Sequence, residues 1–259
     1  MSVKFEMSQN ITTLINDTKG VFSAHRFTIG RYPESVSTLP APGTLPSCLD
    51  MLVKMPGGDL TIPEPYASDA CVTAAFEAAL SFDENIAPGQ MDERHLYLTF
   101  DQRYVEAGKT HRNAGWHFDG MQGSRFPTKL PACRQYVVSD RLATQFYGGP
   151  LDASGLDENT DDFFLAFEDQ IHENAQHYSP ACLEMVCMSA YQVHRSPIAD
   201  FSGWRTFIRI DVSAKEQDRE GNTINPLLPA PWTYVPRPSP VRPDYNIQDS
   251  GWKSANIFS

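Results

Sequence analysis

The clearest repeat of apolar positions along the chain predicts a helix over residues 68–81. Apolar side chains recur there at intervals of three and four residues, which places them in one stripe along a helix. They are Val72, Ala75, Phe76, Ala79 and Leu80. Ser68 suits the N-cap and Asp69 the first turn, and Pro88-Gly89 closes the region. We expect this helix to act as a buttress on the outside of a sheet and to carry no site.

From Arg94 onward the apolar period becomes that of strands. Leu96, Leu98 and Phe100 alternate with other side chains, as they do in a strand whose two faces differ. Similar patterns predict strands over 134–140, 143–147, 183–193 and 205–212, the third as a pair broken near Met188-Ser189. An order rich in strands and poor in helices favours a β-sandwich or a jelly-roll barrel.

The remaining segments predict short elements, turns and a proline-rich end. A short helix is expected behind a Thr160 cap, with apolar residues at a spacing of four up to Ile171,. Thr28 to Tyr32 is interpreted as a further strand, and 56–65 as a turn-rich connection. Beyond Gly221 repeated prolines exclude a central strand or a long helix,. Aromatic residues in that stretch favour an ordered arm that packs across the domain.

Length, charge and cysteine content narrow the class of protein. With 259 residues, 41% of them apolar, the chain suits one domain with a substantial core. A net charge of −11 repels phosphate backbones and anionic lipids, so neither nucleic acid nor a membrane is expected as a partner. Five irregularly spaced cysteines without a C-x-x-C pair fit the reduced thiols of a cytoplasmic protein. Nothing in the pattern specifies an oligomeric state.

An H-x-D pair, His117 and Asp119, carries the strongest chemical signal. Side chains two positions apart on a strand share a face, so this imidazole and this carboxylate are expected to point the same way. His194 stands in a later strand region and offers a second imidazole. Two imidazoles and one carboxylate are the ligand set of non-haem iron(II) oxygenases, which leaves the opposite face of the metal open. The alternative is an ordinary half-buried strand histidine at 117 and a surface histidine near a turn at 194.

Two arginines follow at positions that suit an anionic cosubstrate. Arg205 lies eleven residues after His194, and Arg209 shares a face of the predicted strand with it and with Phe207,. A guanidinium binds a carboxylate bidentately and stays charged. Arg205 is therefore the candidate for the distal carboxylate of a keto acid. Arg209 is a candidate for supporting that cosubstrate or for binding an anionic group of the main substrate.

With this motif, the distal histidine and the arginine behind it, the chain resembles the Fe(II)/2-oxoglutarate-dependent dioxygenases. The resemblance covers roughly 94–213. It implies a mainly β fold of the double-stranded β-helix (jelly-roll) type with flanking helices. The expected organisation is a single catalytic domain over 1–259, with that core, an N-terminal buttress at 1–93 and a proline-rich C-terminal arm at 221–259.

The resemblance also implies the chemistry. Fe(II) would be held by His117, Asp119 and His194, with 2-oxoglutarate and O₂ as cosubstrates. Arg205 would pair with the C5 carboxylate of 2-oxoglutarate, and Thr144 stands where some members use a threonine for the same group. Decarboxylation to succinate and CO₂ would be coupled to oxidation of a second substrate. Halogenating relatives lose the carboxylate ligand, so Asp119 favours hydroxylation, desaturation or ring formation.

Other polar residues near the motif are candidates for substrate contacts. Arg112, Gln122 and Arg125 flank the H-x-D pair and suit a substrate carboxylate, although surface charges paired with nearby acids are the plainer interpretation. Tyr147 is a candidate pocket wall. His111 is expected to be a loop residue near the entrance and not a ligand.

The sequence thus predicts a non-haem iron oxygenase that acts on a small molecule such as an amino acid or a biosynthetic intermediate. Two alternatives stay open. One is a jelly-roll metalloenzyme of cupin type that needs no 2-oxoglutarate, although cupins typically supply three histidines and a glutamate. The other is a non-catalytic binding module on the same scaffold.

Overall fold

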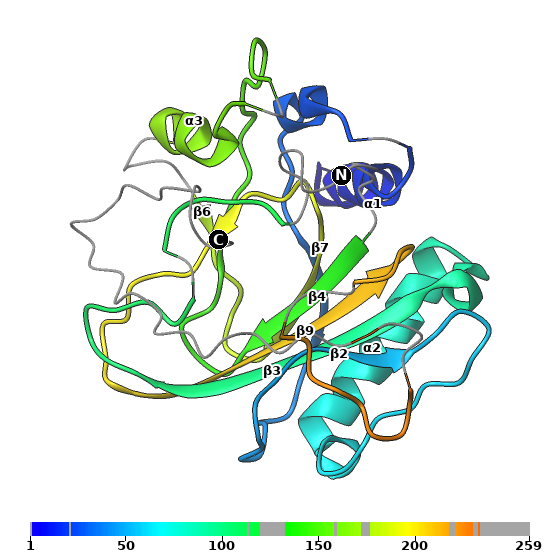
Figure 1. The fold of residues 1–259 in the computed structure, drawn as a ribbon. Coiled ribbons are helices and arrows are strands. Elements are labelled where there is room, and N and C mark those ends of the chain that lie inside the picture. Colours follow the sequence, from blue (N-terminus) through cyan, green and yellow to red (C-terminus); the bar gives the residue numbers. More distant parts are fainter. Residues whose placement is uncertain are drawn as a thin grey trace.

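A computed structural model describes residues 2–20, 22–112, 114–119, 133–157, 160–171, 177–217, 221–229 and 233. Two antiparallel sheets face each other in these residues, and helices lie on their outer sides (Figure 1). The prediction of a mainly β chain with flanking helices is confirmed. Among the described strands, the two sheets do not join into a closed barrel.

The large sheet has six strands in the order β1-β7-β4-β9-β3-β2, and every neighbouring pair is antiparallel. Their bounds are Glu34–Thr38 (β1), Cys48–Lys54 (β2), His95–Val105 (β3), Cys133–Ser139 (β4), Glu184–Ser189 (β7) and Gly203–Ser213 (β9). The strands predicted from Arg94 onward, over 134–140 and over 205–212 are confirmed, as is the first half of the pair predicted over 183–193. The edge strands β1 and β2 come from the first 93 residues of the chain.

The long helix α2 (Ala70–Ile86) covers one face of this sheet, as the apolar stripe predicts. It begins and ends later than predicted, and its N-cap is Asp69. The Asp69 carboxylate accepts a hydrogen bond from the backbone N–H of Val72 at 2.9 Å, which satisfies a helix N–H that has no partner within the helix. Ser68 does not cap the helix, because its hydroxyl donates to the carboxylate of Glu64 at 2.6 Å.

The central strand β9 divides its side chains between the core and the site. Ile208 and Ile210 belong to the core that α2 covers. Arg205, Phe207 and Arg209 alternate with them and line a cavity on the opposite face, as the period of a strand requires. One strand therefore anchors the site directly to the main core.

The small sheet has the order β6-β5-β8. Its strands are Gln145–Tyr147 (β5), His177–Tyr178 (β6) and His194–Arg195 (β8). Beside β8, His117 forms an isolated antiparallel bridge with His194. An apolar cluster joins the facing sheets through Val137, Phe146, Val186, Met188 and Phe207. The helix α3 (Phe163–Gln170) packs with aromatic residues on the outer side of the small sheet.

Some predicted local details are wrong. Thr28 to Tyr32 is not a strand, because Ala24–Thr28 forms a 3₁₀ turn and irregular backbone follows it. The cap of α3 is Asp162, not Thr160. β1 and β2 do not appear in the sequence prediction at all, whereas the strand predicted over 143–147 is present but shorter.

The N-terminal helix α1 (Ser2–Asp17) is tied to the large sheet through its last residue. The buried carboxylate of Asp17 pairs with Arg31 at 2.9 Å and accepts a hydrogen bond from the hydroxyl of Ser189 at 2.6 Å. Burial raises the pKa of Asp17 against the effect of Arg31. The pair therefore fixes the orientation of α1 more than it adds stability.

Only the start of the predicted arm 221–259 belongs to the described residues. This part lies along β2, where the side-chain amide of Asn225 donates to the carbonyls of Leu52 and Thr61, both at 2.8 Å. The remainder of the arm, apart from residue 233, lies outside the described residues.

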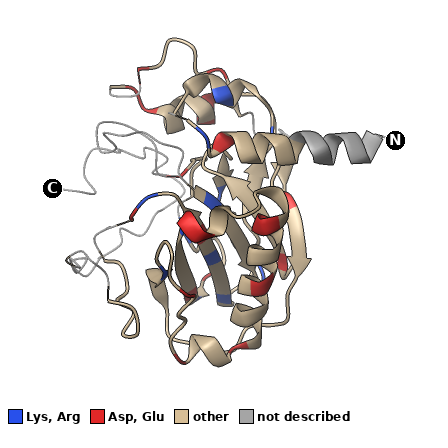
Figure 2. Cartoon of the chain, turned by 90° about the vertical axis from the view of Figure 1, so that its right-hand side faces the viewer, with Lys and Arg blue, Asp and Glu red and all other residues tan. Residues whose placement is uncertain are grey.

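All five cysteines are free, and Cys48, Cys71 and Cys187 are buried, as the spacing predicts. None of the described helices has the length and apolarity needed to cross a bilayer. Figure 2 shows acidic positions on the helices and connecting segments, whereas basic positions also mark strands in the interior of the molecule.

Candidate metal centre

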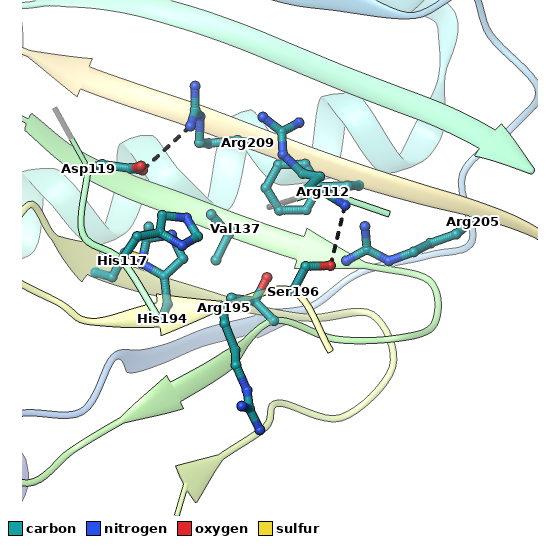
Figure 3. A pocket seen from close by; sticks show the side chains of 12 residues that line it. Arg112, His117, Asp119, Val137, His194, Arg195, Ser196, Arg205 and Arg209 are labelled. Carbon is teal, nitrogen blue, oxygen red and sulfur yellow. Dashed lines mark hydrogen bonds and ion pairs between the residues drawn. The ribbon is translucent and has the colours of Figure 1, made fainter. Parts of the chain in front are cut away.

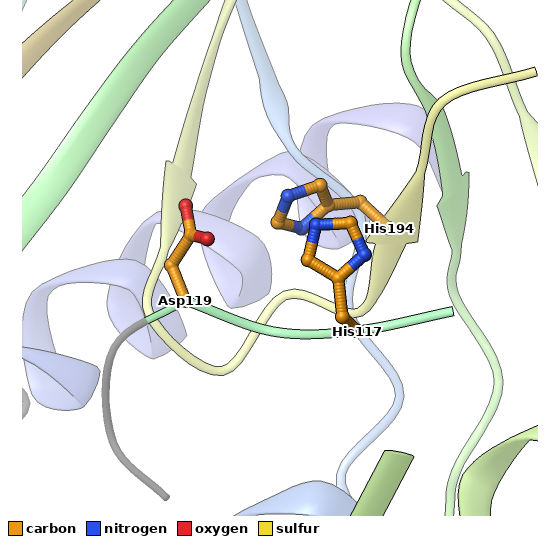
Figure 4. Close-up of side chains that lie close together, drawn as sticks. All are labelled: His117, Asp119 and His194. Atoms are coloured by element: carbon orange, nitrogen blue, oxygen red, sulfur yellow. The ribbon is translucent and has the colours of Figure 1, made fainter. Parts of the chain in front are cut away.

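His117, Asp119 and His194 lie together beside the small sheet (Figure 4). Each offers a ligand atom, and these atoms all lie within 4.8 Å of one another. The backbone brings the two histidines together: the N–H of His117 donates to the carbonyl of His194 at 3.0 Å, and the reverse bond is 2.8 Å long. The H-x-D segment is not a regular strand, since only His117 pairs and Asp119 lies in a bend.

Backbone carbonyls fix the orientation of both imidazoles. The Nδ1 atom of His117 lies 2.7 Å from the carbonyl oxygen of Gly115, and the Nδ1 atom of His194 lies 2.9 Å from that of Gln192. A carbonyl can only accept, so each Nδ1 carries the hydrogen and each Nε2 presents a lone pair. Metal-binding histidines are typically held in this way.

The donor set fits a transition-metal ion. Bonds of about 2.0–2.2 Å put neighbouring donor atoms about 3 Å apart, so small side-chain rotations close the observed spread of 4.8 Å. Two nitrogens and one carboxylate oxygen on one side of a metal are the facial triad of non-haem iron(II) sites. Burial and the neighbouring His194 lower the pKa of His117 to about 4, which keeps the imidazole neutral and able to bind a metal.

Arg209 holds the carboxylate of Asp119 from the β9 side. Its Nη1 atom lies 3.5 Å from Asp119 Oδ2, its Nη2 atom 2.5 Å from Asp50 Oδ1, and its Nε atom 3.1 Å from Asp211 Oδ2. Burial alone lowers the pKa of Arg209, but the three carboxylates raise it above its usual value. Arg209 lines the cavity, as expected for a cosubstrate contact, but its described partners are carboxylates of the protein.

Arg205 has a different environment: in the described part of the chain, no carboxylate is in direct contact with it. It is 1% exposed, and its Nε donates to the carbonyls of Arg141 and Leu142 at 3.0 Å. One terminal nitrogen bonds to His111 at 2.6 Å and the other to Ser139 at 2.8 Å. Burial, and then the charge of Arg112, lower the pKa of Arg205 to about 9, so the guanidinium still carries its charge at pH 7.

These bonds leave Arg205 able to bind an anion. A guanidinium has five N–H groups, and the described bonds occupy one on Nε and one on each terminal nitrogen. One N–H remains on each terminal nitrogen, which is the number that a bidentate carboxylate takes. A buried cation without a direct counter-ion is costly unless an anion compensates it.

The triad and Arg205 belong to one cavity of about 70 Å³, several times the space that one water molecule needs. In Figure 3 the triad lies at one end, Arg205 at the other, and Arg112 between them. The cavity is lined by Arg112, His117, Asp119, Val137, Thr144, Met188, His194, Arg195, Ser196, Arg205, Phe207 and Arg209. Among the residues that the structure describes, four arginines line the cavity and Asp119 is the only acidic lining residue.

The other predicted site residues have mixed outcomes. Thr144 and Arg112 line the cavity, and Arg112 pairs with the buried Asp101 at 3.0 Å. Tyr147 is not among the lining residues and instead packs against Trp116, with ring centroids 6.1 Å apart. Gln122 and Arg125 lie outside the described residues.

Sequence reasoning missed several residues of the site. Arg195 and Ser196 line the cavity, and their position directly after His194 was a usable signal. Asp101 and His111 are buried behind Arg205 and Arg112. The prediction that His111 is a residue at the entrance is wrong, because its side chain is fully buried.

Comparisons with known proteins do not identify a family. No family model matches the chain, and neither does any curated protein. Among solved structures, two crystal structures show a weak similarity to the chain. EvdMO1 is 12% identical with a TM-score of 0.35, over 80% of this chain and 44% of its own length. AviO1 from Streptomyces viridochromogenes Tue57 is 13% identical with a TM-score of 0.33, over 81% of this chain and 83% of its own. This chain thus spans less than half of EvdMO1, and at such scores neither likeness bears on its activity.

Proposed function

We propose that this protein is a non-haem iron(II) oxygenase that couples decarboxylation of 2-oxoglutarate to oxidation of a small-molecule substrate. Hydroxylation of an amino acid or a biosynthetic intermediate is the leading reaction. One observation carries the proposal: a metal-ligand triad and a buried arginine, which has no direct counter-ion among the described residues, lie at opposite ends of one cavity. A cosubstrate with a chelating keto acid at one end and a carboxylate at the other matches that arrangement.

In this proposal the facing sheets are the two halves of a double-stranded β-helix. Antiparallel pairing throughout both sheets and an apolar cluster between them support this interpretation. The cavity lies between the sheets, with β9 supplying Arg205 and Arg209 and β8 supplying His194 and Arg195. Loops and strand ends at such a position can change with the substrate while the core stays intact.

Each main residue of the candidate site then has a role. His117 and His194 bind the metal through Nε2, and Asp119 binds it through a carboxylate that Arg209 orients. Arg205 binds the distal carboxylate of 2-oxoglutarate. Apolar contacts from the lining residues exclude water, which strengthens these charged interactions. A bound iron(II) ion would provide the site for O₂ activation; the four electrons that reduce O₂ would come from 2-oxoglutarate and the substrate, two from each, which gives succinate, CO₂ and the oxidised substrate.

The proposal is tested with protein purified without oxygen. Fe(II) and 2-oxoglutarate are added, air is admitted, and succinate is measured with and without a panel of small-molecule substrates. We expect succinate from the wild type and none from His194→Ala. Arg205→Met should raise the 2-oxoglutarate concentration needed by at least about tenfold, because a buried charge pair is lost, while iron affinity stays unchanged.

Two outcomes would contradict this function. Absence of both iron binding and succinate would rule out an oxygenase of this type. Metal-dependent turnover that ignores 2-oxoglutarate and is unchanged in Arg205→Met would instead favour a jelly-roll metalloenzyme of cupin type.

A further inference from the structure

The imidazole of His111 is a neutral acceptor for Arg205. Its Nδ1 atom lies 2.6 Å from Arg205 Nη1, and a guanidinium nitrogen can only donate. Nδ1 therefore carries no hydrogen, and the hydrogen of the neutral ring is on Nε2. This tautomer is opposite to that of the two candidate metal ligands, whose Nδ1 atoms face carbonyl oxygens. Burial, and the charge of Arg205, lower the pKa of His111 to about 4.

Asp101 stands behind the imidazole and favours the same tautomer. His111 Nε2 lies 3.4 Å from Asp101 Oδ2, and both side chains are fully buried. This contact is longer than an ordinary hydrogen bond, and no other described residue hydrogen-bonds to Nε2. A carboxylate still favours the ring hydrogen on the nitrogen that faces it. Arg112 and Arg103 also bind Asp101. Burial alone raises the pKa of Asp101, but His111 and these two arginines lower this pKa overall. The carboxylate of Asp101 is therefore ionised.

The absence of charge on the Arg205 acceptors has a functional consequence. A carboxylate in direct contact would orient the guanidinium equally well, but it would also neutralise the charge that an incoming anion needs. Two carbonyls, a hydroxyl and an imidazole orient Arg205 without doing so. Two acids, Asp140 and Asp101, act on the charge of Arg205 from a distance, and Asp101 is separated from it by the imidazole and already has two arginines as partners.

We propose that His111 is a positioning residue for Arg205: it holds the guanidinium toward the cavity through a neutral contact and so preserves its affinity for the distal carboxylate of the cosubstrate. The inference rests on the proposed function, because it assumes that a dicarboxylate binds there. It assigns His111 no contact with the metal or with the reacting atoms.

Three substitutions separate orientation from charge. In His111→Asn the amide oxygen takes the place of Nδ1 and the site stays neutral. His111→Leu removes the acceptor at similar volume. His111→Asp differs from the asparagine variant by one group and places a carboxylate beside Arg205. The measurement is the Kd of 2-oxoglutarate for anaerobic Fe(II)-loaded protein, read from the visible absorption of the chelate, with the Kd of Fe(II) measured separately.

We expect 2-oxoglutarate affinity to decrease in the order wild type, His111→Asn, His111→Leu, His111→Asp. The asparagine variant should stay within about threefold of the wild type. The leucine variant should lose about tenfold, which is a typical effect of one hydrogen bond to a charged group, and the aspartate variant should lose more. Iron affinity should not change. His95→Leu is the matched control, because His95 is a buried histidine at the start of β3, whereas His111 follows the end of that strand. The Kd of 2-oxoglutarate for the His95→Leu variant should equal that for the wild type.

The outcomes distinguish this inference from the proposed function. A wild type that binds no 2-oxoglutarate overturns both. A wild type that binds it, with equal affinity in the aspartate and asparagine variants, overturns the role of His111 alone. That pair decides the question even where His111→Leu does not fold. Nitrogen-15 spectra of the histidines add an independent check, since a wild-type His111 with its hydrogen on Nδ1 would also overturn the inference.

Discussion

His117 and His194 exchange two backbone hydrogen bonds, at 3.0 Å and 2.8 Å, and the centroids of their imidazole rings lie 4.4 Å apart. Directly opposite residues of an antiparallel pair place their side chains on the same face. Two donors that are far apart in the chain are therefore brought together by main-chain pairing alone. The remaining donor, Asp119, depends on the bend that follows His117 and on its ion pair with Arg209.

The first prediction concerns metal binding. Fe(II), or Mn(II) in its place, should stabilise the wild type, because an ion that binds only the folded state adds about 2.7 kcal/mol at 100 times its Kd. For a chain of this size that is a rise in Tm of about 5–10 °C. His194→Ala should abolish the rise. The measurement is a thermal melt with and without metal.

The control for metal binding is His177→Ala. His177 lies on β6 and is exposed, and it is not a member of the triad. This variant should keep the full metal-dependent rise in Tm. Equal stabilisation of His194→Ala and the wild type would mean that the ion binds elsewhere.

A second prediction concerns Arg209. Arg209→Met leaves Asp50, Asp119 and Asp211 without their shared cation in a largely buried site. Removing one partner from a buried charge network costs about 3–5 kcal/mol, and loss of a residue that orients a ligand costs about 10–100-fold in metal affinity. Urea unfolding and metal titration measure the two effects.

Arg195→Met is the matched control for Arg209. Its guanidinium stacks 4.4 Å above the Trp116 ring, and in Figure 3 it extends away from the other arginines. Its loss should cost only about 1 kcal/mol. If Arg209→Met were as stable as this control and kept its metal affinity, the carboxylate network would not be what holds Asp119.

Local sequence patterns predicted the elements whose two faces differ. The alternation on β3 and β9 and the apolar stripe of α2 follow directly from burial on one face. β2 was missed because residues on both of its faces are buried, including Asp50 and Lys54, so its sequence does not alternate. β1 is a short polar edge strand, Glu34–Thr38, and edge strands of this kind carry little apolar signal.

Only those residues of the candidate site whose type and spacing in the sequence match a known chemistry could be predicted. His117, Asp119, His194 and Arg205 were found in this way, and the structure brings the two histidines and Asp119 together. The partners of Arg209 and Arg205 were not found. Asp50 and Asp211 reach Arg209 from β2 and β9, and Asp101 and His111 come from β3 and the loop after it. The contacts of Asp50, Asp101 and His111 depend on which strands pair and in which register, and on the path of a loop. Asp211 is different, because it follows Arg209 by two residues on the same strand and so lies on the same face of it,.

A third prediction is a pH dependence that belongs to His111. The pKa of His111 is lowered from about 6.5 to about 4 in the folded protein by burial and by Arg205, against the effect of Asp101. The unfolded chain therefore binds more protons between these values, and the free energy of unfolding falls as pH falls through this range. Above pH 6.5 the contribution is fully present.

From pH 7.5 to pH 5 this one group should lower the free energy of unfolding by about 2 kcal/mol. Urea unfolding of metal-free wild type and His111→Asn at both pH values measures the difference, because contributions of other groups cancel between the two proteins. The groups that face His111 are Asp101 and Arg205, with Arg103 and Arg112 behind Asp101. Parallel pH dependences in the two proteins would show that His111 is not buried as a neutral group.

The last prediction tests the scaffold without touching the site. Asp83 on α2 accepts two hydrogen bonds from Arg134 on β4, at 2.6 Å and 2.7 Å, and one from the Tyr136 hydroxyl at 2.8 Å. All three side chains are buried, so Asp83→Leu leaves the charge of Arg134 without its partner and should cost about 3–5 kcal/mol in urea unfolding. Tyr136→Phe removes one hydrogen bond and should cost about 1 kcal/mol.

Because α2 covers the face of the sheet opposite the cavity, the metal affinity of the folded fraction should stay unchanged in both variants. A fall in metal affinity that matched the loss of stability would mean that the helix-covered face and the triad are coupled through β4 and β9.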